Sequence, residues 1–238
     1  MNICLITRTQ PGADASVMAL SARGLQALAI PAAEILPMPG ELDLRGVQAL
    51  LMTSAAAARC VTPSPEILDM PVYAVGDMTA TSAIENNFTN VVSAGGDGAA
   101  LAVLAADRLK PSEGALLHVR GKEVAGDVTG MLSACGFETR FQEVYRTIDA
   151  PNFRNQIREH VAQQMGAIII HSPAGGRRVA MALEALESHL NRWSLFGLSQ
   201  ACLGQLGTLP FKTRFYADKP DEKALLDLVA ANHSHFGP

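Results

Sequence analysis

Short apolar runs recur along the chain, and most are followed by a helix-capping residue and a stretch with apolar residues at helical spacing. The runs cover residues 3–6, 47–52, 72–75, 91–93, 116–119 and 167–170, with two more at 194–198 and 211–216. Such runs predict buried strands, and their alternation with helices predicts a parallel, doubly wound sheet. The pattern therefore predicts an α/β fold.

Helical patterns separate these strands, and Ser, Thr or Asp at their starts predicts where many of them begin. The predicted helices cover residues 14–24, 54–59, 77–87, 97–109, 123–135, 152–164, 173–190 and 221–231. Pro63 and Pro65 are expected to end the second of these. The tail, residues 233–238, is expected to fray.

Two segments, 25–37 and 137–148, are unusually long for strands and are predicted to be extended. Pro31, Pro37 and Pro39 exclude a helix in the first segment. A strand of about twelve residues can span roughly 40 Å, about twice the usual length, so it can leave one domain and enter another.

The chain also contains an imperfect duplication. Arg8 and residues 20–25 match Arg120 and residues 132–137 at a spacing of 112, Ser54 matches Ser172 at 118, and residues 97–101 match 221–225 at 124. Because the drift in spacing requires only loop insertions, the two halves are expected to share one architecture.

The two extended segments are better domain borders than residues 110–114, which form an ordinary short loop. We expect a discontinuous first α/β domain of residues 1–36 and 148–238 and an inserted second α/β domain of residues 38–146. Each should have a parallel, flavodoxin-like sheet. The extended segments would form a two-stranded bridge between the domains, with a ligand cleft between them.

Composition narrows the choice of partners. The formal net charge is -4, which disfavours nucleic acid, and no apolar run reaches the roughly 18 residues of a membrane span. Cys4, Cys60, Cys135 and Cys202 are far apart and form no CxxC motif, which indicates free thiols in a reducing compartment. We expect a cytoplasmic protein with neither a nucleic-acid nor a membrane partner, in which a local cluster binds any anion.

Motifs for metals and phosphates are missing from the sequence. The histidines have no HxxxH or HExxH spacing, and His118 and His171, which end predicted strands, are interpreted as satisfied core or rim residues. The glycines at 95, 96 and 98 lack the lysine of a P-loop, and a turn before a helix explains them. We predict no metal and no cofactor.

Hydroxyl side chains stand where predicted strands lead into helices, at Ser54, Thr79, Ser172 and Ser199. Each one could simply cap a helix, but four such residues favour a site beside the free N–H groups at the sheet's edge. No serine has a His and an acid arranged nearby, so a serine nucleophile has no support. Basic residues at similar places could pair with carboxylates of a ligand, namely Arg8, Arg59, Arg120, Lys122, Arg146, Arg177 and Arg178.

Tyr145 lies in the second extended segment. Its phenol could donate a proton to a ligand, or the ring could simply pack in a strand. Both interpretations stay open.

A series of motifs, in this order and spacing, resembles the uroporphyrinogen-III synthase family. They are LITR at 5–8, MTSAAAAR at 52–59, VYAVGDMTA at 72–80, LHVRG at 117–121, GFE to VYR at 136–146, IIIHSP at 168–173 and PDEKAL at 220–225. The resemblance covers nearly the whole chain, although each motif alone is weak.

The resemblance implies a cofactor-free hydro-lyase of tetrapyrrole (heme) biosynthesis. It would close hydroxymethylbilane, a small-molecule polycarboxylate, into uroporphyrinogen III with loss of water and inversion of the D ring. We expect a monomer. By the resemblance, Tyr145 is the catalytic candidate that protonates or orients the leaving hydroxyl.

The resemblance also implies a set of substrate-binding residues, among which Gly76 would allow close approach of the backbone. The set comprises Arg8, Ser54, Ala55, Gly76, Thr79, Arg120, Gly121, Ser172 and Ser199. Residues 198–203, the second-half counterpart of 75–80, lack the Gly and Thr found there.

Two other functions stay open. The chain could be a non-catalytic, two-domain sensor that binds a tetrapyrrole or another small anion. A flavodoxin-like nucleotide-binding protein is a further alternative, which the missing phosphate loop disfavours.

Overall fold

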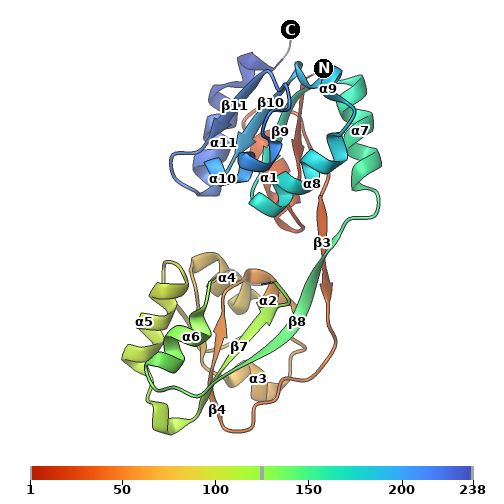
Figure 1. Cartoon of the computed structure of the whole chain (residues 1–238). Helices are drawn as coiled ribbons and strands as arrows, with labels where there is room; N and C mark the ends of the chain where they lie inside the picture. Colours follow the sequence, from red (N-terminus) through yellow and green to blue (C-terminus); the bar gives the residue numbers. More distant parts are fainter. Residues whose placement is uncertain (1, 124–125, 237–238) are drawn as a thin grey trace. The chain divides into compact units, whose positions relative to one another are not determined.

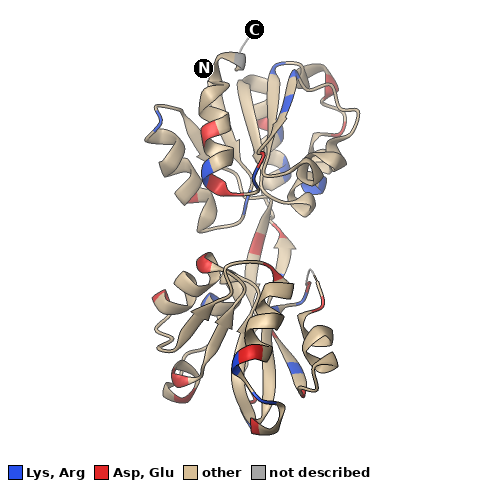
Figure 2. Ribbon diagram, turned by 90° about the vertical axis from the view of Figure 1, so that its left-hand side faces the viewer, with Lys and Arg blue, Asp and Glu red and all other residues tan. Residues whose placement is uncertain are grey.

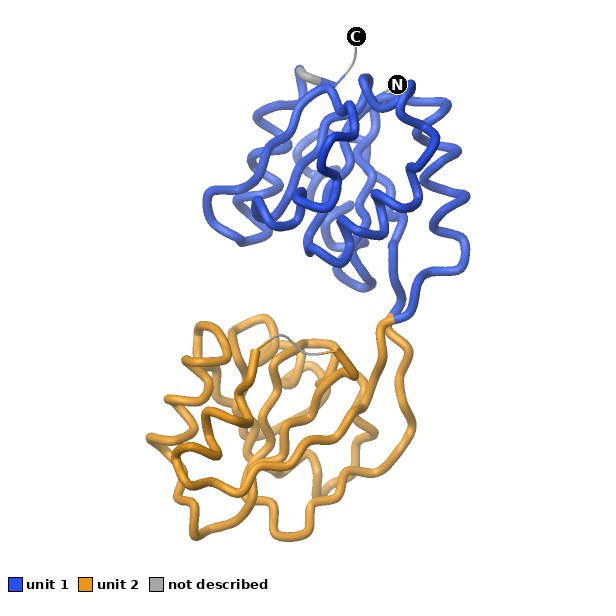
Figure 3. Tube along the Cα trace, in the orientation of Figure 1, with its two compact units in different colours: residues 1–34, 148–238 blue, residues 35–147 orange. Residues whose placement is uncertain are grey.

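The computed structural model describes residues 2–123 and 126–236. The chain divides into two compact units, which we call unit 1 (Met1–Glu34 with Ile148–Pro238) and unit 2 (Ile35–Thr147) (Figure 3). The domain borders expected from the sequence lie at 36/38 and 146/148, and the units change over at 34/35 and 147/148. Each unit is a sheet with helices on both faces (Figure 1).

Unit 1 contains a parallel, five-stranded sheet in the order β2-β1-β9-β10-β11. One face is covered by α1 and α11, which pack on Ile6 and Ile169, and the other by α7 and α8, which pack on Leu5 and Ile168. The strands are β1 (Asn2–Ile6), β2 (Ala27–Ala29), β9 (Met165–Ile170), β10 (Trp193–Gly197) and β11 (Thr213–Tyr216). The helices are α1 (Gly12–Ser21), α7 (Phe153–Gln163), α8 (Pro173–Leu183), α9 (Glu187–Leu190), α10 (Gln200–Leu203) and α11 (Glu222–Ala231).

Unit 2 contains a six-stranded sheet in the order β3-β8-β7-β4-β5-β6. Its strands from β4 to β8 are parallel, with α2 and α4 on one face and α5 and α6 on the other. The strands are β3 (Ala33–Pro37), β4 (Val47–Met52), β5 (Val72–Ala74), β6 (Val91–Ser93), β7 (Ala115–Gly121) and β8 (Thr139–Asp149). The helices are α2 (Ala55–Cys60), α3 (Pro65–Asp69), α4 (Asp77–Glu85), α5 (Gly98–Arg108) and α6 (Val128–Ala134). The neighbouring strands β3 and β8 both continue across the border into unit 1.

The strand orders confirm the duplication predicted from the sequence. The spacings of 112, 118 and 124 pair β1 with β7, β9 with β4 and the start of α11 with that of α5. The spatial order β2-β1-β9-β10-β11 of unit 1 then corresponds, strand by strand, to β8-β7-β4-β5-β6 of unit 2. The strands of unit 2 can be numbered 1 to 5 along the chain from β4 to β8, leaving β3 out. Their spatial order is then 3-2-1-4-5, and the expected flavodoxin order of 2-1-3-4-5 was wrong for this unit. The reason is that the chain leaves unit 1 after two strands and completes unit 2 before it returns.

Some predicted helices were wrong in their limits. The helix expected over 173–190 is interrupted after α8, because Ala185 has φ 63° and takes the chain out of the helix. Pro65 begins the short helix α3 instead of ending a helix, with Ser64 as its N-cap. In the segment 123–135 the helix α6 starts after Asp127, which accepts the N–H of Gly130, and residues 124–125 of that prediction lie outside the described residues.

The frayed tail was also wrong as far as residue 236. Phe236 is only 5% exposed and packs edge-on against Phe196 at a ring distance of 5.7 Å, so it belongs to the core of unit 1. Residues 237–238 lie outside the described residues. All four cysteines are free thiols. None of the helices in the described segments combines the length and apolar character needed to cross a bilayer.

Candidate functional site

In each sheet, two adjacent strands in its interior lead into helices on opposite faces. In unit 1 they are β1, which leads to α1, and β9, which leads to α8; in unit 2 they are β7, which leads to α6, and β4, which leads to α2. Ligands of open α/β sheets bind at the switch point between two such strands, beside their carboxyl ends. The predicted residues Arg8, Ser172, Ser54, Arg120 and Gly121 all lie at one of these two switch points.

Tyr145 and Ser54 form a hydroxyl pair at the switch point of unit 2. The Tyr145 phenol donates to Ser54 Oγ at 3.0 Å, and Ser54 Oγ also accepts the N–H of Ala56, which makes it the N-cap of α2. Since Ser54 accepts both bonds, its own proton stays free for a ligand. Ala55 is the first residue of that helix.

Gly121 determines where the ring of Tyr145 lies. The two residues are partners across β7 and β8, and a Cβ on Gly121 would come within 2.5 Å of Tyr145 Cζ. No side chain fits between them. Tyr145 is 8% exposed, so its ring is fixed by packing with the hydroxyl directed at Ser54.

His118 contacts Thr53, the residue that precedes Ser54. Its Nε2 is 3.0 Å from Thr53 Oγ1, so the sequence-based interpretation of a satisfied core histidine is confirmed for this nitrogen. Burial, with a smaller contribution from the charge of Arg120, lowers the pKa of His118 to about 4. The ring is therefore neutral at neutral pH, so it cannot act there as an imidazolium that donates a proton.

Arg120 has contacts but no hydrogen-bonded counter-ion among the described residues. Its guanidinium carbon lies 3.7 Å from the centre of the Phe141 ring. Among the described residues the only acidic group near it is Glu143, whose Oε1 is 3.7 Å from Nη2. Its Nε is buried and has no hydrogen-bond partner in the described part of the chain. It retains donors for a carboxylate.

The switch point of unit 1 is charged and internally paired. Glu222 accepts from Arg8 Nη1 at 2.6 Å and from the Ser16 hydroxyl at 2.5 Å, and its Oε2 lies 3.0 Å from His171 Nε2. The His171 contact is at an ion-pair distance without the alignment of a hydrogen bond, and Nδ1 has no partner within residues 2–123 and 126–236. His171 is therefore not the satisfied histidine that the sequence suggested.

The ionisation of Glu222 follows from these neighbours. Burial alone would raise the pKa of this carboxyl, but His171, the Ser16 hydroxyl and the charge of Arg8 together lower it to about 2. Arg8, expected to be free for a ligand, is thus engaged by an ionised carboxylate. Pattern analysis had placed Glu222 only within the motif at 220–225, because a first-turn glutamate is an ordinary feature of a helix.

The remaining predicted residues also lie where strands lead into helices, but they make only local contacts. Ser172 caps α8 by accepting the N–H of Gly175 at 3.0 Å, whereas Ser199 makes no cap bond and lies 3.4 Å from Cys202 Sγ. Thr79 is 5% exposed in the first turn of α4. Gly76 is extended, with φ −166°, and a Cβ there would have an ordinary 3.6 Å contact, so the local backbone does not require glycine.

Among the other basic candidates, Arg178 pairs with Asp149 at 2.6 Å and Arg59 donates to the Ser82 hydroxyl at 3.2 Å. Lys122, Arg146 and Arg177 are exposed. Figure 2 shows basic and acidic residues interspersed along each unit. Within the described segments no three His, Cys, Asp or Glu side chains are grouped to hold a metal ion.

Comparisons with known proteins agree on one family. Residues 14–227 match the family described as uroporphyrinogen-III synthase HemD. The crystal structure of uroporphyrinogen-III synthetase from Helicobacter pylori is similar, with a TM-score of 0.68 and 18% identity over 97% of this chain and 99% of that one. A mutant uroporphyrinogen III synthase from Thermus thermophilus gives 0.53 and 13% over 96% and 97%. At these identities the structures support the fold alone. No curated protein sequence matches the chain.

Proposed function

The chain belongs to the uroporphyrinogen-III synthase family of tetrapyrrole biosynthesis, and we propose that it closes hydroxymethylbilane into uroporphyrinogen III as a hydro-lyase, with inversion of the D ring. The observation that supports the proposal most directly is the hydrogen bond between Tyr145 and Ser54 at the switch point of unit 2. This pair supplies a hydroxyl proton where an α/β sheet binds its ligand.

In the proposed reaction the carbon–oxygen bond of the hydroxymethyl group breaks first. Ser54 gives its proton to the departing oxygen and receives one from Tyr145, so water leaves and a phenolate remains. The cationic azafulvene left behind is stabilised by its own pyrrole nitrogen, and the substituted carbon of the D ring attacks it to form a spiro intermediate. The bond between that carbon and the bridge to ring C then breaks, which leaves a second azafulvene cation on ring C. The unsubstituted carbon of the inverted D ring attacks this cation and closes the macrocycle. The ring proton lost in the last step returns to the phenolate, which balances the loss of one water.

Binding falls to groups that suit carboxylates. The N–H groups at the starts of α2 and α8, the free proton of Ser54 and the guanidinium of Arg120 are donors at the carboxyl ends of the strands. In this proposal the switch point of each unit is able to bind carboxylates. Action as a monomer in the cytoplasm is part of the same proposal, to which the four free thiols lend support.

The test is the isomer formed from freshly generated hydroxymethylbilane. We expect the purified chain to yield the type III isomer, whereas the uncatalysed reaction yields type I. A product that is type I at every protein concentration contradicts the proposal. If the protein is nevertheless stabilised by the substrate against heat, the non-catalytic sensor becomes the better description.

A further inference from the structure

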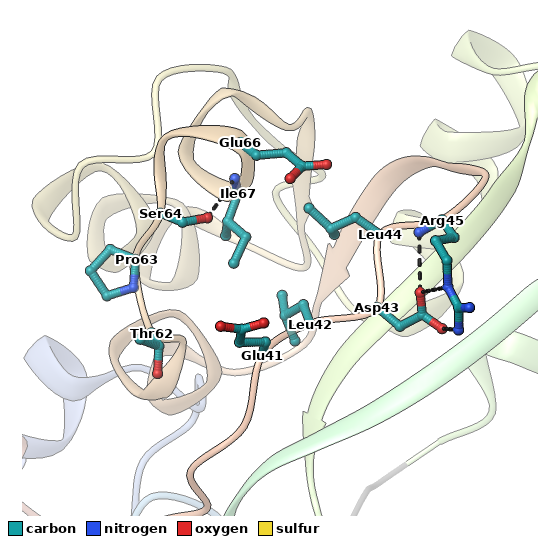
Figure 4. A pocket seen from close by; sticks show the side chains of 10 residues that line it. All are labelled: Glu41, Leu42, Asp43, Leu44, Arg45, Thr62, Pro63, Ser64, Glu66 and Ile67. Carbon is teal, nitrogen blue, oxygen red and sulfur yellow. Dashed lines mark hydrogen bonds and ion pairs between the residues drawn. The ribbon is translucent and has the colours of Figure 1, made fainter.

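Unit 2 contains a pocket at the amino-terminal ends of its strands, whereas the switch point lies at their carboxyl ends. Its volume is about 530 Å³, and it is lined by residues 41–45, which lead into β4, and by residues from 62 to 67, which lead through α3 towards β5 (Figure 4). Because β4 and β5 are parallel, both segments lie at the amino-terminal edge. We call this the amino-edge pocket. The proposed reaction does not use it.

The floor of the amino-edge pocket is apolar. Leu42 and Ile67 are 8% and 5% exposed and belong to the core of unit 2, and Leu44 packs beside them. The loop that carries Leu42 is tied to β8, since the Gln142 side-chain amide donates to the Glu41 carbonyl and accepts the N–H of Asp43. The pocket is therefore built on a fixed loop and a core surface.

Two carboxylates at the rim have no counter-charge among the described residues. Asp43 is neutralised by a two-pronged contact with Arg45, at 2.8 Å from Nε and 2.6 Å from Nη2. Glu41 and Glu66, in contrast, have no ion-pair partner in the described part of the chain. In Figure 4 the side chains of Leu44 and Ile67 lie between these two carboxylates, and Leu42 lies beside Glu41.

This arrangement selects one class of ligand. An anion would be repelled, and the acidic groups do not gather in the threes that a metal site needs within the described segments. Two separated negative charges across an apolar floor suit a molecule with two cationic ends joined by a hydrocarbon chain. We propose that the amino-edge pocket binds an aliphatic diammonium ion, one ammonium group on Glu41, the other on Glu66, and the methylenes on Leu42, Leu44 and Ile67.

The experiment is calorimetric titration of the full chain with a series of straight-chain α,ω-diamines, with the monoamine and the diol of each length as controls. The expected result is saturable binding with an optimum length, in which the diamine binds at least about tenfold more tightly than the monoamine. Glu41→Gln and Glu66→Gln should each reduce the diamine to the affinity of the monoamine.

A matched control separates specific binding from bulk attraction. The double variant Glu85→Gln with Asp107→Asn removes two exposed charges elsewhere in unit 2, and it should bind the diamine like the parent chain. An equal loss of affinity in this variant, equal binding of monoamine and diamine, or no saturation with any diamine overturns the proposal. None of these outcomes bears on the isomer test, so the two proposals fail separately.

Discussion

The two units have the same arrangement of strands but different chemistry at equivalent places. In unit 1, Glu222 gathers Arg8, Ser16 and His171 around one carboxylate. The spacings of the duplication place Gly98, Arg120, Val128 and Thr53 at the corresponding positions of unit 2, where a Cβ on Gly98 would lie 2.9 Å from Val128. Glu222 has no counterpart there, and Arg120 is 3.7 Å from the carboxylate of Glu143, whereas Arg8 donates to Glu222 at 2.6 Å. Whether an arginine at the end of a strand is available to a ligand thus depends on whether the protein itself supplies a counter-ion.

The hydroxyl pair shows the opposite asymmetry. Ser54 and Ser172 are equivalent and both cap a helix, but the spacing of 112 places the buried Ala33 where unit 2 has Tyr145. Likewise Thr9 corresponds to Gly121. Only unit 2 therefore combines a phenol with the glycine that makes room for it, and we expect the chemical step there and only binding in unit 1.

The largest effect is expected from Gly121→Ala. The added methyl would displace the Tyr145 ring, so we expect kcat for the type III product to fall about a hundredfold and the free energy of unfolding to fall by about 1–3 kcal/mol. Activity and urea unfolding of the same preparation measure the two effects. Thr9→Ala, at the equivalent place in unit 1, should change stability by no more than about 0.5 kcal/mol.

Tyr145→Phe separates the ring from its hydroxyl. If kcat falls in Gly121→Ala because the hydroxyl moves away from Ser54, then Tyr145→Phe should lower kcat similarly with little loss of stability. An unchanged rate in Tyr145→Phe would remove the phenol from the mechanism.

Glu222→Gln tests the charged cluster of unit 1 and should have a smaller effect. The variant keeps the shape but leaves Arg8 without its counter-ion, and since both side chains are about one-third exposed, solvent screening limits the loss to about 1 kcal/mol at neutral pH. The pKa of Glu222 is lowered from its ordinary 4.5 to about 2, so its contribution is complete above pH 4.5 and is lost as the pH falls towards 2.

Urea unfolding at a series of pH values measures this dependence. The difference between the parent chain and Glu222→Gln should be constant from pH 7 to about 4.5 and should shrink below it. Glu159→Gln, which removes an exposed carboxylate of the same unit, is the control and should show no such dependence. A difference that stays constant down to about pH 2 would mean that the loss of a hydrogen-bond acceptor, not the loss of the charge, destabilises the variant.

The elements that sequence could predict are those with local causes. Apolar runs and caps predicted the strands and several helix starts, including Ser54, Asp97, Ser172 and Asp221, which all make cap bonds. The duplication predicted which strands correspond. The sequence pattern could not predict features that depend on contacts between residues distant in sequence. Examples are the burial of Phe236 against Phe196 and the contact between Arg8 and Glu222, which are 214 residues apart.

The candidate site shows the same division. Strand ends and capping residues predicted that Ser54 and Arg120 lie together, because parallel strands end together, and the resemblance added Gly121. That Gly121 makes room for the Tyr145 ring required the register of β7 and β8, where an irregularity pairs these two residues. Register is not readable from either strand alone.

The smallest expected effect concerns two serines at strand-to-helix turns of unit 1. Ser172→Ala removes the bond to the Gly175 N–H and should cost about 1 kcal/mol, whereas Ser199→Ala removes no cap bond and should stay within about 0.5 kcal/mol. Thermal and urea unfolding of both variants measure the difference. Similar costs would mean that Ser199 caps α10 in solution, and the contrast between it and Ser172 would disappear. A small cost for Ser199→Ala together with an unchanged KM would instead remove Ser199 from the binding residues, so that Ser172, at the switch point itself, would be the serine of unit 1 that still has a role.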